Sequence, residues 1–66
     1  MDKKKILIVD DELSVRDSLS NWFAADGYDV SCAENAVLAL EQLEQKEFQI
    51  ILMLIVAGIL LQVLVL

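Results

Sequence analysis

The chain has 66 residues, a net charge of −6 and no histidine or proline, so it can form one small domain that needs a staple or a partner. Its single cysteine excludes an internal disulfide, and the lack of histidine excludes histidine-based acid–base catalysis and the usual zinc clusters. Five basic residues against eleven acidic ones argue against direct nucleic-acid binding, because phosphate neutralisation requires clustered Lys and Arg.

Charge and hydrophobicity divide the chain into two parts. Every charged residue lies within residues 1–47, whereas residues 48–66 carry no charge and are apolar at 16 of their 19 positions. The chain therefore joins a segment of ordinary globular composition to a segment that is almost purely apolar.

The first predicted elements are a strand and a helix. Residues 6–9 form a short run rich in β-branched side chains between charged clusters, which is typical of a strand buried on both faces of a parallel sheet. The helix is expected to have Ser14 as its N-cap, with Asp17 as the capping-box partner, and to stop at Gly27. Its apolar face, with Trp22 in the core, is expected to consist of Val15, Leu19, Trp22 and Phe23.

A second strand, a second helix and a third strand are expected next. Residues 28–32 alternate between apolar and polar, which indicates a half-buried edge strand with Cys32 as a small buried residue. The second helix is expected to run from a cap at Asn35 to Lys46, and residues 48–53 are predicted to form a third, fully buried strand. The inward stripe of the second helix is expected to consist of Ala36, Ala39, Leu40 and Leu43.

This order of elements predicts an α/β fold, β-α-β-α-β, with a parallel sheet, right-handed crossovers and helices on the faces of the sheet. Residues 55–66 are ambiguous between a third helix, a strand and part of a membrane span. As a helix, residues 50–66 would be roughly 25 Å long, which is short of the ~30 Å hydrocarbon core of a bilayer. A membrane anchor is therefore the less favoured alternative, and it stays open.

Two adjacent carboxylates follow the first strand. Asp10 and Asp11 lie where a buried strand ends and a helix is about to begin, and ligand sites in open α/β sheets gather at the carboxyl ends of strands. The two like charges repel each other, and a divalent cation such as Mg2+ would relieve the repulsion. The residues alone leave a second interpretation open, in which the acids only complement the helix dipole.

The apolar strand that ends in Asp10, Asp11 and Glu12 is followed by Arg16 and Leu19 and by the short stretches 27–30, 33–35, 39–40 and 50–53. In these residues, over positions 3–53, the chain resembles the N-terminal half of a response-regulator receiver domain of bacterial two-component signalling. The first helix looks most like that of receivers attached to sigma-54-dependent transcriptional activators, which implies a part in transcription regulation.

The resemblance implies a flavodoxin-like sheet, with a half-domain at residues 1–53 and a divergent apolar segment at residues 54–66 that is not a separate domain. It implies a cytoplasmic protein that is not an enzyme and whose partner is a sensor histidine kinase. It also implies that Asp10 and Asp11 bind Mg2+ and that an aspartate at the end of the third strand accepts the phosphoryl group. The position that matches the acceptor holds Leu54.

Leu54 changes the chemistry that the resemblance implies. Leucine has no oxygen nucleophile and forms no acyl phosphate, and it leaves a weakened Mg2+ site of two acids. We expect a truncated receiver that is not phosphorylated, because the family's later strands, with their switch hydroxyl and lysine, are also missing. Three explanations of residues 54–66 compete. The first is engineering or a frameshift-like change, the second is that the residues are misassigned, and the third is a natural degenerate fragment. If those residues are misassigned, the chain is an ordinary phospho-accepting receiver.

The apolar part of the chain also predicts self-association. The third strand is expected to have no fourth strand beside it, and an open apolar edge pairs with other chains. We therefore expect a homo-oligomer formed through the third strand and the apolar C-terminal segment. The alternative from another class is a membrane-anchored or purely structural self-assembling element.

Overall fold

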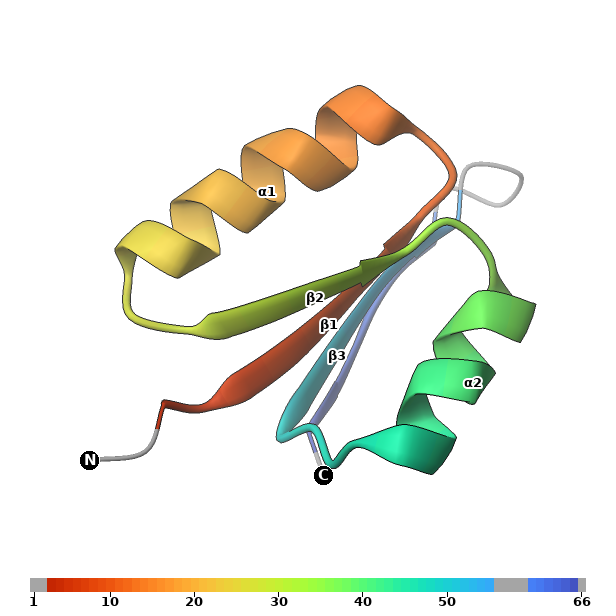
Figure 1. Cartoon of the computed structure of the whole chain (residues 1–66). Helices are drawn as coiled ribbons and strands as arrows, with labels where there is room; N and C mark the ends of the chain where they lie inside the picture. Colours follow the sequence, from red (N-terminus) through yellow and green to blue (C-terminus); the bar gives the residue numbers. More distant parts are fainter. Residues whose placement is uncertain (1–2, 56–59, 66) are drawn as a thin grey trace.

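A computed structural model gives the fold of the chain. It describes the backbone of residues 3–55 and 60–65 and the side chains of residues 3–54. The elements in this part of the chain (Figure 1) are β1 (Lys5–Asp10), α1 (Leu13–Ala25), β2 (Asp29–Ala33), α2 (Ala36–Gln45), β3 (Ile50–Ile55) and β4 (Leu60–Val65).

The strands form one sheet in the order β2-β1-β3-β4. β1 pairs in parallel with both β2 and β3, whereas β4 runs antiparallel to β3. α1 and α2 pack on opposite faces of the sheet (Figure 1), which is the arrangement that crossover helices give to a parallel sheet. The predicted β-α-β-α-β order and the parallel sheet of three strands, consistent with a flavodoxin-like fold, are confirmed.

The central position of β1 divides the core into two layers. β1 is buried from Ile6 to Asp10 because it has a strand on each side and a helix over each face, and its successive side chains point to opposite faces. The buried residues of the α1 layer are Ile6, Ile8 and Leu52, with Leu19, Phe23, Tyr28, Val30, Ile50 and Leu54 packed against them. The buried residues of the α2 layer are Leu7, Val9, Ala33, Ala39, Phe48 and Ile51.

The start of α1 differs from the prediction. The helix begins at Leu13, its N-cap residue is Glu12, and no side chain caps it, so Ser14 lies inside the first turn. Asp10 accounts for the earlier start, because its carboxylate accepts the backbone N–H of Glu12 at 2.9 Å and so forms the turn that leads into the helix. The predicted capping box of Ser14 and Asp17 is therefore wrong.

The end of α1 and the start of α2 agree with the prediction. Gly27 follows α1 with a φ of 95°, in the left-handed region that glycine adopts readily. The Gly27 N–H donates to the Ala24 carbonyl and the Tyr28 N–H donates to the Phe23 carbonyl, both at 3.1 Å, which together form a Schellman motif. α2 begins at Asn35, whose side-chain oxygen accepts a backbone N–H of the first turn at 2.9 Å.

Trp22 and Cys32, both expected in the core, are exposed. Leu19 and Phe23 lie four residues apart and take the core positions of α1, so Trp22 falls on the flank of the helix and is 71% exposed. Cys32 lies on the edge strand β2, where its sulfur is 2.8 Å from the hydroxyl oxygen of Ser20 on α1. An edge strand leaves one side of such a residue open to solvent.

The inward stripe of α2 is narrower than predicted. Ala39 and Leu43, one turn apart, face the core, whereas Ala36 is exposed and Leu40 is 59% exposed. α2 lies over β1 and β2, with Ile51 of β3 in the same buried layer, and it buries one narrow row of side chains there. The expectation that Ala36 and Leu40 belong to the buried stripe is therefore wrong.

The apolar C-terminal part contains two paired strands. β3 begins at Ile50, two residues later than predicted, and Phe48 is buried just before it. Ile55 of β3 stands opposite Leu60 of β4, so the chain returns along the edge of β3. The expectation that the third strand has no strand beside it is therefore wrong.

The sequence leaves residues 55–66 open between a helix, a strand and part of a membrane span. Residues 60–65 form a strand, and residues 56–59 and 66 lie outside the described part of the chain. Within that described part, no helix has the length and hydropathy needed to cross a membrane.

Candidate functional site

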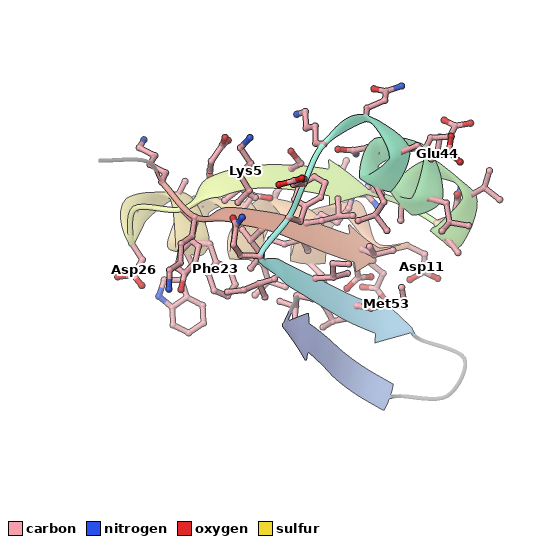
Figure 2. All side chains as sticks on the ribbon, turned by 90° about the horizontal axis from the view of Figure 1, so that it is seen from below. Lys5, Asp11, Phe23, Asp26, Glu44 and Met53 are labelled. Atoms are coloured by element: carbon pink, nitrogen blue, oxygen red, sulfur yellow. The ribbon has the colours of Figure 1, made fainter. Side chains whose placement is uncertain are left out.

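The candidate site lies at the carboxyl ends of β1 and β3. Asp10, the last residue of β1, stands opposite Leu54 of β3 in the parallel register. Figure 2 shows Asp11 and Met53 at the same end of the sheet, away from Lys5. Parallel pairing has thus brought together two positions that are far apart in the sequence, at the edge of the sheet where α/β proteins bind ligands.

Asp10 is the one charged residue among the buried residues of the described part of the chain, at 3% exposed. Its carboxylate oxygen Oδ1 accepts the Glu12 N–H at 2.9 Å, and its backbone carbonyl accepts a hydrogen bond of 2.6 Å from Nη1 of Arg16. A buried carboxylate is costly unless it is hydrogen-bonded, and a bond to an ionised acceptor is stronger than one between neutral groups. The start of α1 therefore supplies the hydrogen bond that this carboxylate needs.

The local sequence explains how Arg16 reaches Asp10. Asp11 and Glu12 are the whole connection between β1 and α1, so the first turn of the helix lies directly above the end of the strand. Arg16 is on that first turn, where its N–H also bonds to the Glu12 carbonyl at 3.0 Å. A long guanidinium side chain from this position can fold back over the end of β1.

Asp11 and Leu54 are the other two residues of the site. Asp11 is exposed beside the buried Asp10, so one carboxylate of the pair faces solvent. Leu54 is half-buried and packs against the α1 layer of the core. In the described residues, no group of three or more acidic or cysteine side chains is placed to hold a metal ion. The site thus offers two carboxylates and, at the β3 position, a hydrocarbon side chain.

The sequence predicts Asp10, Asp11 and Leu54 as positions of the site but gives no role to Arg16, which matters there only as one residue of the family resemblance. Its spacing of six residues from Asp10 has no helical or strand periodicity, because the two residues belong to different elements. The contact becomes visible only when the short connection between β1 and α1 is known.

Most of the chain matches a known protein family. The family model described as the response regulator receiver domain matches residues 6–56, which run from Ile6 of β1 past the end of β3 and include Asp10, Asp11 and Leu54. No curated protein and no solved structure matches the chain significantly.

Proposed function

The chain belongs to the response regulator receiver domain family, whose members act in two-component signalling, and we propose that this receiver is not phosphorylated at the acceptor position of the family. The resemblance assigns that position to Leu54, and a leucine side chain has no atom that can attack a phosphoryl group. The parent family implies a sensor histidine kinase as partner and a protein that is not itself an enzyme. A sigma-54-dependent activator remains the proposed type of parent protein, with a role in transcription regulation in the cytoplasm.

One observation carries the proposal. Leu54 stands in register with Asp10 and packs against the buried cluster formed by Ile6, Ile8 and Leu52, so it is part of the hydrophobic layer under α1. A side chain with this packing serves the fold, and no carboxylate is left at the β3 position to accept a phosphoryl group. We further propose that residues 1–53 are the receiver unit and that residues 54–66 are a divergent segment of the same domain, because β3 and β4 continue the same sheet.

Receiver domains generally bind Mg2+, and the oxygen donors of this site are of the kind that suits that ion. Carboxylate oxygens are suitable ligands for Mg2+. One oxygen of Asp10 is already bonded to the Glu12 N–H, and Asp11 is the acid that follows it directly at the end of β1. We therefore propose a weakened site, with Asp10 and Asp11 as its ligands. A cation there would neutralise the repulsion between the two carboxylates.

The phosphorylation proposal can be tested with a small phosphodonor. The wild-type chain is incubated with acetyl phosphate and Mg2+, and its intact mass is measured together with that of a complete receiver domain as positive control. We expect no phosphoryl adduct on the chain. A Mg2+-dependent adduct that hydroxylamine removes would be an acyl phosphate and would contradict the proposal. Peptide sequencing of residues 50–66 in the same sample tests the alternative that the chain is an ordinary phospho-accepting receiver.

The metal proposal predicts that Leu54→Asp strengthens Mg2+ binding. A third carboxylate about 4 Å from a divalent ion contributes roughly 2 kcal/mol even in a water-like dielectric, so we expect a roughly tenfold or greater gain in affinity by calorimetric titration. Leu54→Asn, of nearly equal shape but neutral, is the matched control and is expected to give no such gain. Asp11→Asn, at an exposed position, is expected to weaken binding in the wild-type background. Equal Mg2+ affinity in all four chains would refute the site.

A second proposed function is self-association, either of the receiver itself or as a purely structural assembling element. The observation that favours it is the uncharged strand β4 at one edge of the sheet. Sedimentation velocity of the wild-type chain separates the two candidates from a monomeric receiver.

A further inference from the structure

The two edges of the sheet are built differently. β2 forms one edge and β4 forms the other. α1 and α2 both pack against β2, whereas in the described part of the chain β4 packs only against β3. Figure 2 shows β4 on the far side of β3 from the rest of the sheet. The outer edge of β4 therefore presents backbone N–H and C=O groups without a neighbouring strand in the described fold.

The sequence of β4 also lacks the features that protect an edge strand. Residues 60–65 contain no charge, no proline and no glycine, whereas β2 begins with the exposed residue Asp29. Natural proteins discourage pairing at an open edge with charged residues, proline or bulges, or by covering the edge. β4 has the composition of a strand that is paired on both sides.

The chemistry of the outer edge of β4 limits which partner can pair with it. A partner has to supply backbone donors and acceptors in an extended conformation and has to bring no charge next to an uncharged strand. A second copy of the chain meets both requirements with the same segment, because all its charges lie within residues 1–47. We propose that β4 pairs antiparallel with β4 of a second copy and that the two four-stranded sheets join into one. This inference deepens the self-association proposed above.

Symmetry limits the register of this pair. Two identical adjacent strands that run antiparallel are related by a twofold axis perpendicular to the sheet. Directly opposite residues in neighbouring strands lie on the same face, so the sum of their residue numbers has to be even and one residue stands opposite itself. For a strand of residues 60–65, the longest such overlaps place either Gln62 or Val63 on the axis. The dimer therefore has two permitted registers of equal length.

Cysteine cross-linking tests both the partner and the register. In a Cys32→Ser background, Gln62→Cys and Val63→Cys are oxidised under mild conditions and the disulfide-linked dimer is measured. Residues directly opposite have Cα atoms about 4.5–5.5 Å apart, within the range of about 4.4–6.8 Å that a disulfide spans. We expect rapid cross-linking of one of these variants and slow cross-linking of the other, since a shift of one residue moves the cysteine off the axis.

The matched control is Ser31→Cys in the same background, which places the cysteine on the opposite edge strand β2. This variant is expected to remain uncross-linked. Equal cross-linking of all three variants, or none in any of them, would overturn the β4 pairing. In a parallel measurement, sedimentation velocity of the wild-type chain is expected to give a dimer, and Val63→Lys is expected to give a monomer with an unchanged far-UV circular dichroism spectrum. A wild-type monomer would also overturn the inference.

These measurements use neither a phosphodonor nor Mg2+. A failure of the β4 pairing therefore leaves the phosphorylation proposal unaffected, and a phosphorylated wild-type chain leaves the β4 pairing unaffected.

Discussion

Asp10 serves the fold and the candidate site at the same time. Its carboxylate forms the turn before α1 through the Glu12 N–H, and its carbonyl holds the Arg16 guanidinium. A residue in this position is required for the start of the helix whether or not a cation is present. The acidic residue at the end of β1 therefore has a structural role even when the β3 position holds Leu54.

Arg16 is expected to contribute to stability through the Asp10 carbonyl. Arg16→Met removes a hydrogen bond with a charged donor, and because the site is only partly buried we expect a loss of about 1–2 kcal/mol in the free energy of unfolding. Arg16→Lys keeps the charge but not the planar guanidinium and is expected to lose about half as much. Urea unfolding followed by far-UV circular dichroism measures both values.

The control for Arg16 is the exposed neighbour Asp17. Asp17→Asn lies on the same helix and is expected to change the free energy of unfolding by no more than about 0.5 kcal/mol, as exposed substitutions usually do. If Arg16→Met and Asp17→Asn changed the free energy of unfolding equally, the hydrogen bond of Arg16 to the Asp10 carbonyl would contribute nothing to stability.

At the scale of elements, the C-terminal end of α1 combines a backbone motif with aromatic packing. The Schellman hydrogen bonds join Tyr28 to Phe23, and the rings of these residues pack edge to face with centroids 5.5 Å apart. Trp22 extends this cluster toward solvent, 5.9 Å from the Phe23 ring. The chain reversal between α1 and β2 is therefore held by both main-chain and side-chain contacts.

Gly27→Ala is expected to destabilise the fold through its backbone conformation. A Cβ at Gly27 would meet no atom within 4 Å, so the cost comes from the positive φ of 95° and not from a clash. We expect a loss of about 1–2 kcal/mol in the free energy of unfolding. Gly27→Asn is the matched variant, and its loss is expected to be smaller because asparagine tolerates the left-handed region. A loss for Asn equal to or larger than that for Ala would argue against this explanation.

At the scale of the whole molecule, the charged residues and the two helices belong to the same part of the fold. Both helices pack on β1 and β2, and all of the charge lies within residues 1–47. β3 and β4 are uncharged, and in the described part of the chain β4 packs only against β3. One side of the molecule is therefore a charged receiver surface, and the other is an uncharged sheet edge.

The proposed β4 pairing predicts that stability depends on protein concentration. If the folded state is a dimer and the unfolded state is a monomer, mass action raises the urea midpoint as the concentration increases. The midpoint of the wild-type chain is therefore expected to rise over a hundredfold range of concentration, and that of Val63→Lys is expected to stay constant. Coincident wild-type curves at all concentrations would contradict the dimer.

Most of the fold could be predicted from patterns that are local in the chain. The apolar run of β1 between charged clusters, the glycine at position 27 and the cap at Asn35 depend on neighbours within a few residues. The alternation of strands and helices then leads to a parallel sheet, because crossover connections of this length leave few other topologies. Asp10 and Asp11 follow a strand directly, so their place at its carboxyl end could also be predicted.

Tertiary structure alone decided the features that depend on distant neighbours. Trp22 and Leu40 lie at the margins of apolar stripes, and whether such a residue is buried depends on which strands the helix covers. A uniformly apolar run has no period of its own, so residues 60–65 became an antiparallel strand only through pairing with β3. The contact of Arg16 with Asp10 and the register of Asp10 with Leu54 arise in the same way, because packing and pairing bring together residues whose spacing in the sequence carries no signal.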